Sequence, residues 1–283
     1  MVVLLALGSA AAYGISDFAG GILSRRSSPW AVAVAAQASA AVLTLLVATL
    51  SWGDPEPAAW AWGALSGVGG GFGAAFLYRG LGAGSMTVVA PVSAVGAALL
   101  PVAVGIASGE RPNALTWIGV ACAFPAIWLV SLAIEAPGGT HAPRRRGRAG
   151  ELTDGLLAGL GFGLLFSALG QVRDTAGLGP LAMSYAVSVP ATIVLAIMLG
   201  ASWVPRGRAA VQAVGVGVFG TAATVLFLLA AQTGLLTVAA VMSSLYPATT
   251  VLLAAVLLHE RIGKAQGLGL LLAGCAVGLV AAG

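Results

Sequence analysis

One acid in the sequence lies where an acid is costly. Asp17 falls within an apolar run, residues 2–23, that is long enough to cross a membrane as a helix. If that run is centred near residue 12, a rise of about 1.5 Å per residue puts Asp17 about 7 Å from the bilayer midplane. An aspartate within the hydrocarbon costs roughly 2.5–3.5 kcal/mol on insertion scales. We therefore expect Asp17 either to bind a substrate or a proton, or to form a structural ion pair, for which Arg79 is the only nearby candidate.

Polar side chains in the other apolar runs could line a cavity with Asp17. Their chemistry is hydrogen bonding through hydroxyl and amide groups, and each is as able to bond a neighbouring backbone as to touch a substrate. The sequence thus predicts a hydrogen-bonding cavity whose members come from Tyr13, Gln37, Ser66, Tyr78, Ser93, Gln171, Thr224, Ser243, Ser244 and Tyr246.

Two Glu-Arg pairs stand at the ends of apolar runs. Glu110-Arg111 and Glu260-Arg261 each follow a run of about 20 mostly apolar residues. We expect these pairs to anchor or cap the helix ends at the membrane interface. The alternative is a gate contact that breaks when one face of the protein opens.

The sequence contains no convincing enzyme motif. A Gly-x-Gly-x-x-Gly pattern at 215–220 lies inside an apolar run, with no strand before it and no acid about 20 residues after it. The single lysine, Lys264, lacks the upstream glycine of a phosphate-binding loop, and His141 and His259 lack metal-ligand spacing. We predict no catalytic residue, no metal and no cofactor, and therefore a protein that is not an enzyme.

The composition indicates the class of protein in which these residues lie. Charged residues are 8% of the 283-residue chain, against roughly 25% in soluble domains, while apolar residues are 59% and mean hydropathy is +1.00. So few charges could not cover a soluble surface. The largest basic cluster, at 144–148, contains no aromatic residue, which favours a loop at a membrane surface over a nucleic-acid site. We predict an integral membrane protein that contacts the lipid bilayer and binds no nucleic acid.

The apolar runs predict the fold class. Small residues at four-residue spacing, Gly63, Gly67 and Gly71 in one run and glycines 155, 159 and 163 in another, are typical of closely packed membrane helices. No connection between runs is long enough for a soluble catalytic domain. The prediction is an all-α polytopic membrane protein with ten transmembrane helices, near 2–23, 30–51, 59–78, 85–107, 113–134, 152–171, 180–201, 209–231, 236–258 and 265–282.

The chain also repeats itself. A shift of 150 residues places Glu110-Arg111 on Glu260-Arg261 and Ser93 on Ser243. We therefore predict two five-helix repeats, residues 1–134 and 152–283, joined by a basic connecting loop, residues 135–151. A repeat with five spans enters the membrane inverted relative to its copy, and inverted repeats are typical of secondary transporters.

The positive charges predict an orientation. Numbered along the chain, the odd connections hold eleven Lys and Arg residues and the even connections hold two, Arg111 and Arg173. Because positive residues favour the cytoplasmic side, the basic loop is expected there and both termini outside.

Three segments give a family resemblance. YGISDFAGG, VVAPVSAVGAALLPVAVGIASGERP and SSLYPATTVLLAAVLLHERIG resemble the EamA-type transporters of the drug/metabolite transporter superfamily. The resemblance covers essentially the whole chain and implies a ten-helix transporter of the bacterial cytoplasmic (inner) membrane. It further implies carriage of small metabolites or drugs, most often outward, without ATP hydrolysis. The charge distribution of this chain favours both termini outside, whereas the charges of many relatives of this family favour the N-terminus inside.

The resemblance also implies where the cavity lies. In this family it lies between the third, fourth, eighth and ninth helices, with the first and sixth beside them. Pro91 and Pro247 each remove a backbone donor and can kink the fourth and ninth spans. This placement favours Ser93, Ser243 and Tyr246 over Gln37 as cavity residues.

The leading functional hypothesis is a secondary transporter that works by alternating access. Its expected partners are a small-molecule substrate and lipid, with proton coupling and a homodimer left open. One alternative is an intramembrane enzyme, which would need clustered His, Asp or Glu residues at one interface. Another is a non-transporting membrane subunit, which would need large loops facing its partners.

Overall fold

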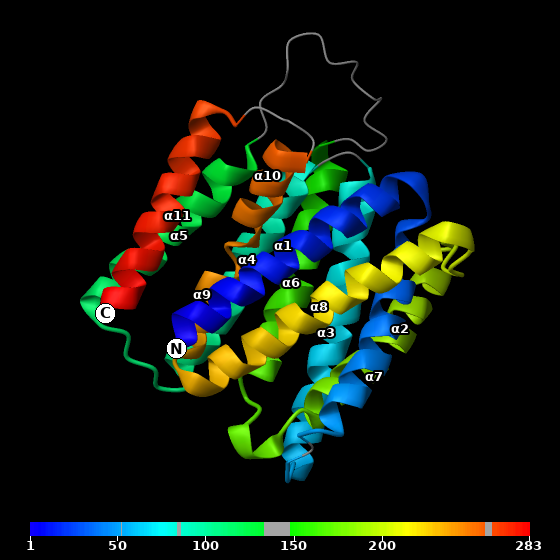
Figure 1. Cartoon of the computed structure of the whole chain (residues 1–283), viewed down its shortest axis with the longest axis horizontal. Helices are drawn as coiled ribbons and strands as arrows, with labels where there is room; N and C mark the ends of the chain where they lie inside the picture. The colour runs from blue at the N-terminus through cyan, green and yellow to red at the C-terminus, as the bar shows by residue number, and fades with distance from the viewer. Residues whose placement is uncertain (52, 84–85, 133–147, 258–261) are drawn as a thin grey trace.

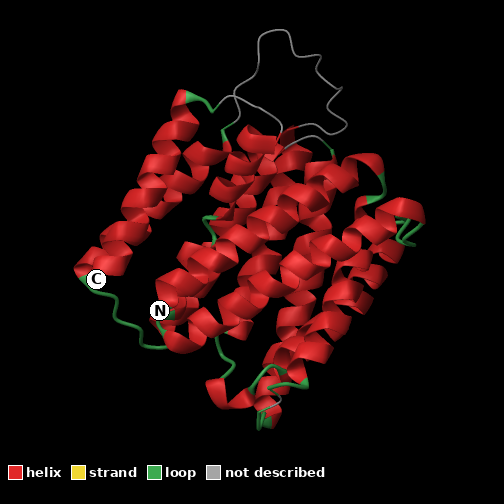
Figure 2. Ribbon diagram, viewed as in Figure 1, coloured by secondary structure: helices red, strands yellow, loops and turns green. Residues whose placement is uncertain are grey.

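The chain folds into a bundle of α-helices (Figures 1 and 2). The computed structural model describes residues 1–51, 53–83, 86–132, 148–257 and 262–283, and none of these residues forms a strand. A short 3-10 helix, η1 (Asp174–Ala176), precedes α7. The α-helices are α1 (Val2–Arg26), α2 (Pro29–Ala48), α3 (Pro57–Gly82), α4 (Met86–Ala107), α5 (Ala114–Ser131), α6 (Arg148–Leu169), α7 (Gly179–Met198), α8 (Gly207–Thr233), α9 (Leu236–Ser243), α10 (Tyr246–Leu257) and α11 (Lys264–Ala282).

In the part of the chain that the structure describes, we assign ten segments as membrane-crossing. Nine segments of the described chain are long and apolar enough to do so, when α9 and α10 are taken together. The tenth is α3, which has 26 residues but contains many glycines that lower its hydropathy. Because α3 packs extensively against α6 and α7, it crosses with its neighbours. The predicted fold class, an all-α polytopic membrane protein with ten transmembrane segments in two inverted five-helix repeats, is confirmed.

The ninth span is broken, where the sequence predicted one helix over 236–258. The first part, α9, ends at Ser243, and α10 begins at Tyr246 after a turn. Pro247 has no N–H for the Ser243 carbonyl, and its ring disfavours helical geometry in the preceding residue. The repeat-related helix α4 contains two internal prolines and is nevertheless continuous.

The glycine stripes bring helix backbones into direct contact. A Cβ atom at Gly67 would lie 2.2 Å from the carbonyl oxygen of Ser184 in α7, and one at Gly63 would lie 2.3 Å from that of Pro180. A Cβ atom at glycine 155, 159 or 163 of α6 would lie 2.9–3.0 Å from the nearest atom of α4. Both stripes therefore serve helix packing, as their spacing predicted.

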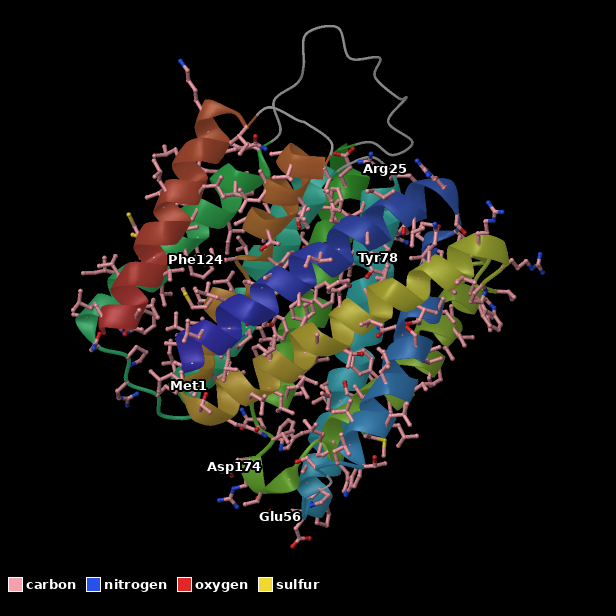
Figure 3. All side chains as sticks on the ribbon, viewed as in Figure 1. Met1, Arg25, Glu56, Tyr78, Phe124 and Asp174 are labelled. Atoms are coloured by element: carbon pink, nitrogen blue, oxygen red, sulfur yellow. The ribbon has the colours of Figure 1, made fainter. Side chains whose placement is uncertain are left out.

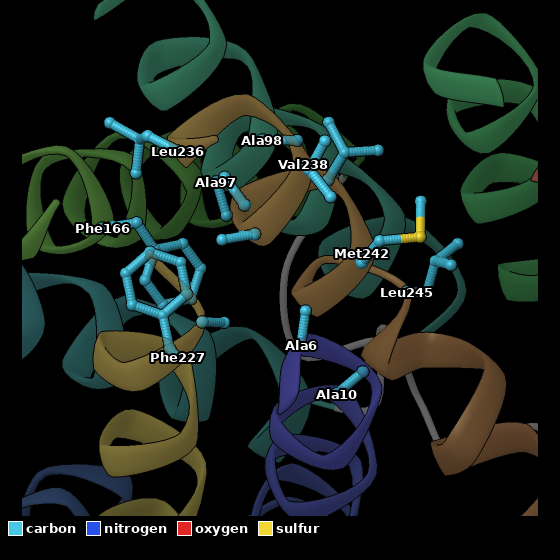
Figure 4. Close-up of a cluster of buried hydrophobic side chains, with 14 of the residues drawn as sticks. Ala6, Ala10, Ala97, Ala98, Phe166, Phe227, Leu236, Val238, Met242 and Leu245 are labelled. Atoms are coloured by element: carbon cyan, nitrogen blue, oxygen red, sulfur yellow. The ribbon is translucent and has the colours of Figure 1, made fainter. Parts of the chain in front are cut away.

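The two repeats interlock and share their core. The most extensive helix pairs, α3 with α6, α5 with α11, α4 with α6, α1 with α8 and α3 with α7, all join one repeat to the other. In the largest buried cluster, Phe166 stacks on Phe227 with ring centroids 4.3 Å apart (Figure 4). Ala6 and Ala97 of the first repeat belong to the same cluster.

The bundle has two distinct ends. Both chain termini lie at one end, together with the α2–α3 and α6–α7 connections, where Glu56 and Asp174 are found (Figures 1 and 3). We call it the terminal end. The opposite end, where α1 finishes at Arg25 and Arg26 and α8 begins, is called the arginine end.

Candidate substrate-binding cavity

A cavity of about 60 Å³ lies between α1, α2, α3, α6, α7 and α8. Three of these helices come from each repeat, so the cavity occupies the interface between the two halves of the protein. A space of this size holds a few water molecules. Its polar lining includes Tyr13, Ser16, Asp17, Gln37, Tyr78 and Tyr185.

Asp17 is the only acid among the described residues that line this cavity. Its side chain is buried, with 8% of the residue exposed. Within the described chain, no cationic side chain pairs with it, and no Lys or Arg lines the cavity. A buried carboxylate without a counter-charge is costly unless a ligand, a proton or water compensates it.

Arg79 is not the partner of Asp17, so the ion pair considered from the sequence is wrong. Arg79 ends α3 and forms a salt bridge with Asp154 of α6, where its Nε donates to the carboxylate at 2.9 Å. The guanidinium also lies over the Phe76 ring, 4.2 Å from its centroid. Asp154 already lay inside the predicted span 152–171, but the sequence interpretation did not consider it as a partner of Arg79.

A hydroxyl network crosses the cavity between α1, α7 and α8. The hydroxyl oxygen of Thr224 lies 2.9 Å from that of Tyr13 and 2.7 Å from that of Tyr185. The Thr224 hydroxyl also donates to the Gly220 carbonyl at 2.8 Å. Tyr185 was not among the polar candidates from the sequence, although a tyrosine in the middle of an apolar run was a sufficient signal.

Gln37 lines the cavity, contrary to the preference drawn from the sequence. Its side-chain amide donates to the Gly70 carbonyl at 3.2 Å, across from α2 to α3. Tyr78, also predicted as a site residue, lines the cavity from α3, with its ring against Gly20. A Cβ atom at Gly20 would lie 2.6 Å from that ring, so the glycine makes room for it.

Ser93, Ser243 and Tyr246 lie outside the described cavity lining, which corrects their predicted place in it. The hydroxyls of Ser93 in α4 and Tyr246 in α10 bond each other at 2.8 Å. Ser243 donates to the carbonyl of Ala6 in α1 at 3.4 Å. These side chains are satisfied within the packed contact of α1, α4, α9 and α10, so the kink-prone fourth and ninth spans contribute packing here.

Glu110 caps a helix, but not the helix that it follows. Its carboxylate accepts the backbone N–H of Leu236 and, at 3.0 Å, that of Thr237, at the first turn of α9. These N–H groups have no partner within their own helix, and negative charge is favourable at a helix N-terminus. The Arg111 guanidinium folds back onto the Glu110 carbonyl at 3.1 Å. Glu260 and Arg261, the related pair, lie outside the described residues.

Backbone contacts also join the repeats at the terminal end. The Asp54 N–H donates to the Thr175 carbonyl at 2.8 Å, and the Leu178 N–H donates to the Ser51 carbonyl at 2.8 Å. Between them, Gly53 adopts a left-handed backbone conformation, with φ of +68°, against the backbone of residues 175–177. These contacts hold α2–α3 to α6–α7 at one end of the cavity helices.

These features define the class of protein. In the described residues, ten membrane-crossing segments in two interlocked repeats enclose a polar cavity at their interface, which is the organisation of a transporter of the drug/metabolite type. The EamA-like transporter family model matches residues 1–132 and 153–282, so the chain belongs to the EamA-like transporter family.

Other comparisons address the fold. A solved structure described only as "Crystal structure of protein" aligns with a TM-score of 0.69 and 16% sequence identity. The alignment covers 98% of this chain and 95% of that one, which shows a shared fold. A search of curated proteins finds no match.

Proposed function

We propose that this protein is a secondary transporter that moves a small molecule across the bacterial cytoplasmic membrane by alternating access. The observation that carries this proposal is the buried carboxylate of Asp17, which has no cationic partner among the described residues, in a cavity between inverted repeats. Export is the proposed direction, following the family resemblance, and the carboxylate is the group through which a proton could be exchanged for substrate.

Alternating access requires that one end of the cavity opens while the other closes. The terminal end is joined across the repeats by the Glu110 cap and by the backbone contacts at Asp54 and Leu178. In the proposed cycle these contacts separate when the terminal end opens, and equivalent contacts at the arginine end close. The narrow cavity suits a conformation in which substrate has not entered.

The test is counterflow in liposomes that contain the purified protein. Vesicles are loaded with one unlabelled compound from a panel of neutral, cationic, anionic and zwitterionic metabolites, and accumulation of the same labelled compound is measured. Accumulation above protein-free vesicles, without ATP, is expected for at least one compound. A panel with no accumulation, from protein that is folded by its melting curve, would overturn the proposal.

A further inference from the structure

We infer that the cavity binds small monocationic amines in preference to amino acids, a substrate class that rests on the proposed transport function. The argument comes from the charge balance of the cavity. Asp17 supplies one negative charge, and no positive side chain among the described lining residues balances it. A ligand with one ammonium group completes that balance.

Arg79 strengthens the discrimination against carboxylates. It is the cation nearest to the lining residue Tyr78 in sequence, but its guanidinium is engaged by Asp154 and by the Phe76 ring. An amino acid would bring its own carboxylate into a space that already holds Asp17 and offers no free guanidinium or ammonium among the described residues. Two like charges in a low-dielectric site repel strongly, so the zwitterion is disfavoured relative to the amine.

The hydrogen-bonding groups point to the same ligand. Ser16 donates its hydroxyl proton to the Val216 carbonyl at 3.0 Å, and Thr224 donates its own to Gly220. Because the Thr224 proton goes to Gly220, the Tyr13 hydroxyl donates to the Thr224 oxygen, and the Tyr185 hydroxyl donates to the Gly220 carbonyl at 3.1 Å. With their protons committed, these four hydroxyls can offer a ligand only acceptor oxygens, and an N–H-bearing ammonium supplies donors to them.

Aromatic rings provide the remaining surface. Tyr13, Tyr78, Phe162 and Tyr185 reach the cavity from four different helices. Asp17 lines the same cavity as Tyr13 and Tyr78, so its carboxylate and these rings share one site. Ring faces attract ammonium groups, whereas they give no stabilisation to a carboxylate.

Matched ligand pairs test this substrate class. Phenethylamine and phenylalanine differ by one carboxylate, as do isoamylamine and leucine, and each compound is titrated against the purified full chain by thermal shift. We expect each amine to bind at least about tenfold more tightly than its amino acid. The Asp17→Asn variant should lose about tenfold to a hundredfold in amine affinity, while Asp17→Glu retains most of it.

Controls separate this inference from the proposed function. Glu56→Gln removes an exposed acid at the terminal end and should bind amines as the unmodified protein does. Equal or tighter binding of the amino acids, or unchanged amine affinity in a folded Asp17→Asn variant, would overturn the inference. If the counterflow panel shows transport of a neutral or anionic compound and of no amine, the transporter stands and the amine class fails. No transport of any compound would remove both.

Discussion

Two carboxylates at the interface between the repeats meet opposite surroundings. Glu110, at the terminal end, accepts two backbone N–H groups from the first turn of α9, and its charge is matched by the helix dipole. Asp17, in the cavity, has no cationic partner among the described residues. The difference teaches that the surroundings of an acid, more than its depth, decide whether it holds the fold together or stays available to a ligand.

Asp154 extends this comparison and should give the largest effect on stability. Asp154→Asn leaves the Arg79 guanidinium without its carboxylate in a site where the Asp154 side chain is 1% exposed. Breaking a buried pair from one side costs about 3 kcal/mol, so the detergent melting temperature should fall by several degrees. Arg79→Gln combined with Asp154→Asn should recover part of that loss. A melting curve equal to that of the unmodified protein would show that this pair is not structural.

Glu110→Ala should give a smaller loss of stability. It removes both acceptors from the N-terminus of α9, which is worth about 1–2 kcal/mol for a helix cap. Hydrogen exchange should accelerate at the Leu236 and Thr237 amides, which the carboxylate now protects. Glu110→Gln keeps one acceptor oxygen, so its stability should lie between that of Glu110→Ala and that of the unmodified protein. Unchanged exchange at both amides would contradict the cap.

Among Asp154, Glu110 and Asp17, the change Asp17→Asn should alter stability least while removing function. The amide keeps the shape of the side chain and removes a charge that no described residue compensates, so stability should stay within about 1 kcal/mol or rise. Transport of the amine identified by counterflow should be lost. Melting temperature and counterflow on the same preparation check both. Full transport by Asp17→Asn would remove Asp17 from the mechanism.

Glu56→Gln is the control for the variants at Asp154, Glu110 and Asp17. Glu56 pairs with Arg173 at 3.4 Å, with both side chains more than half exposed. Exposed pairs of this kind contribute little, so neither the melting temperature nor transport should change measurably. A clear loss would mean that the terminal end depends on exposed charges as well as on the Glu110 cap and the backbone contacts.

The sequence predicted the helices well because their signal is local. Bilayer thickness fixes the length of each apolar run, and nine of the ten predicted spans correspond to single helices, with ends shifted by a few residues. The break before Pro247 was missed because a proline removes one backbone donor whether or not the helix breaks there. Whether the helix then breaks depends on its neighbours, as continuous α4 with its own prolines shows.

The site was predicted only in part, because depth along a helix does not fix the direction in which a side chain points. Asp17, Tyr13 and Tyr78 were placed correctly as residues that share a cavity. Ser93 and Tyr246 have similar chemistry, but they face each other between α4 and α10. The hydrogen-bond partners of Arg79 and Tyr13 come from the other repeat, and no local pattern in the sequence reports such a pairing.

The interlocked repeats also constrain how the protein is made. The Ser16 hydroxyl bonds a carbonyl 200 residues later in the chain, and Ser243 bonds one 237 residues earlier. While the ribosome is still producing the second repeat, the inserted helices of the first have no α6, α7 or α8 to pack against. Asp17 and the glycine faces of α3 then lack the helices that cover them in the folded chain, so we expect the nascent chain to be most open to degradation by membrane proteases in this interval.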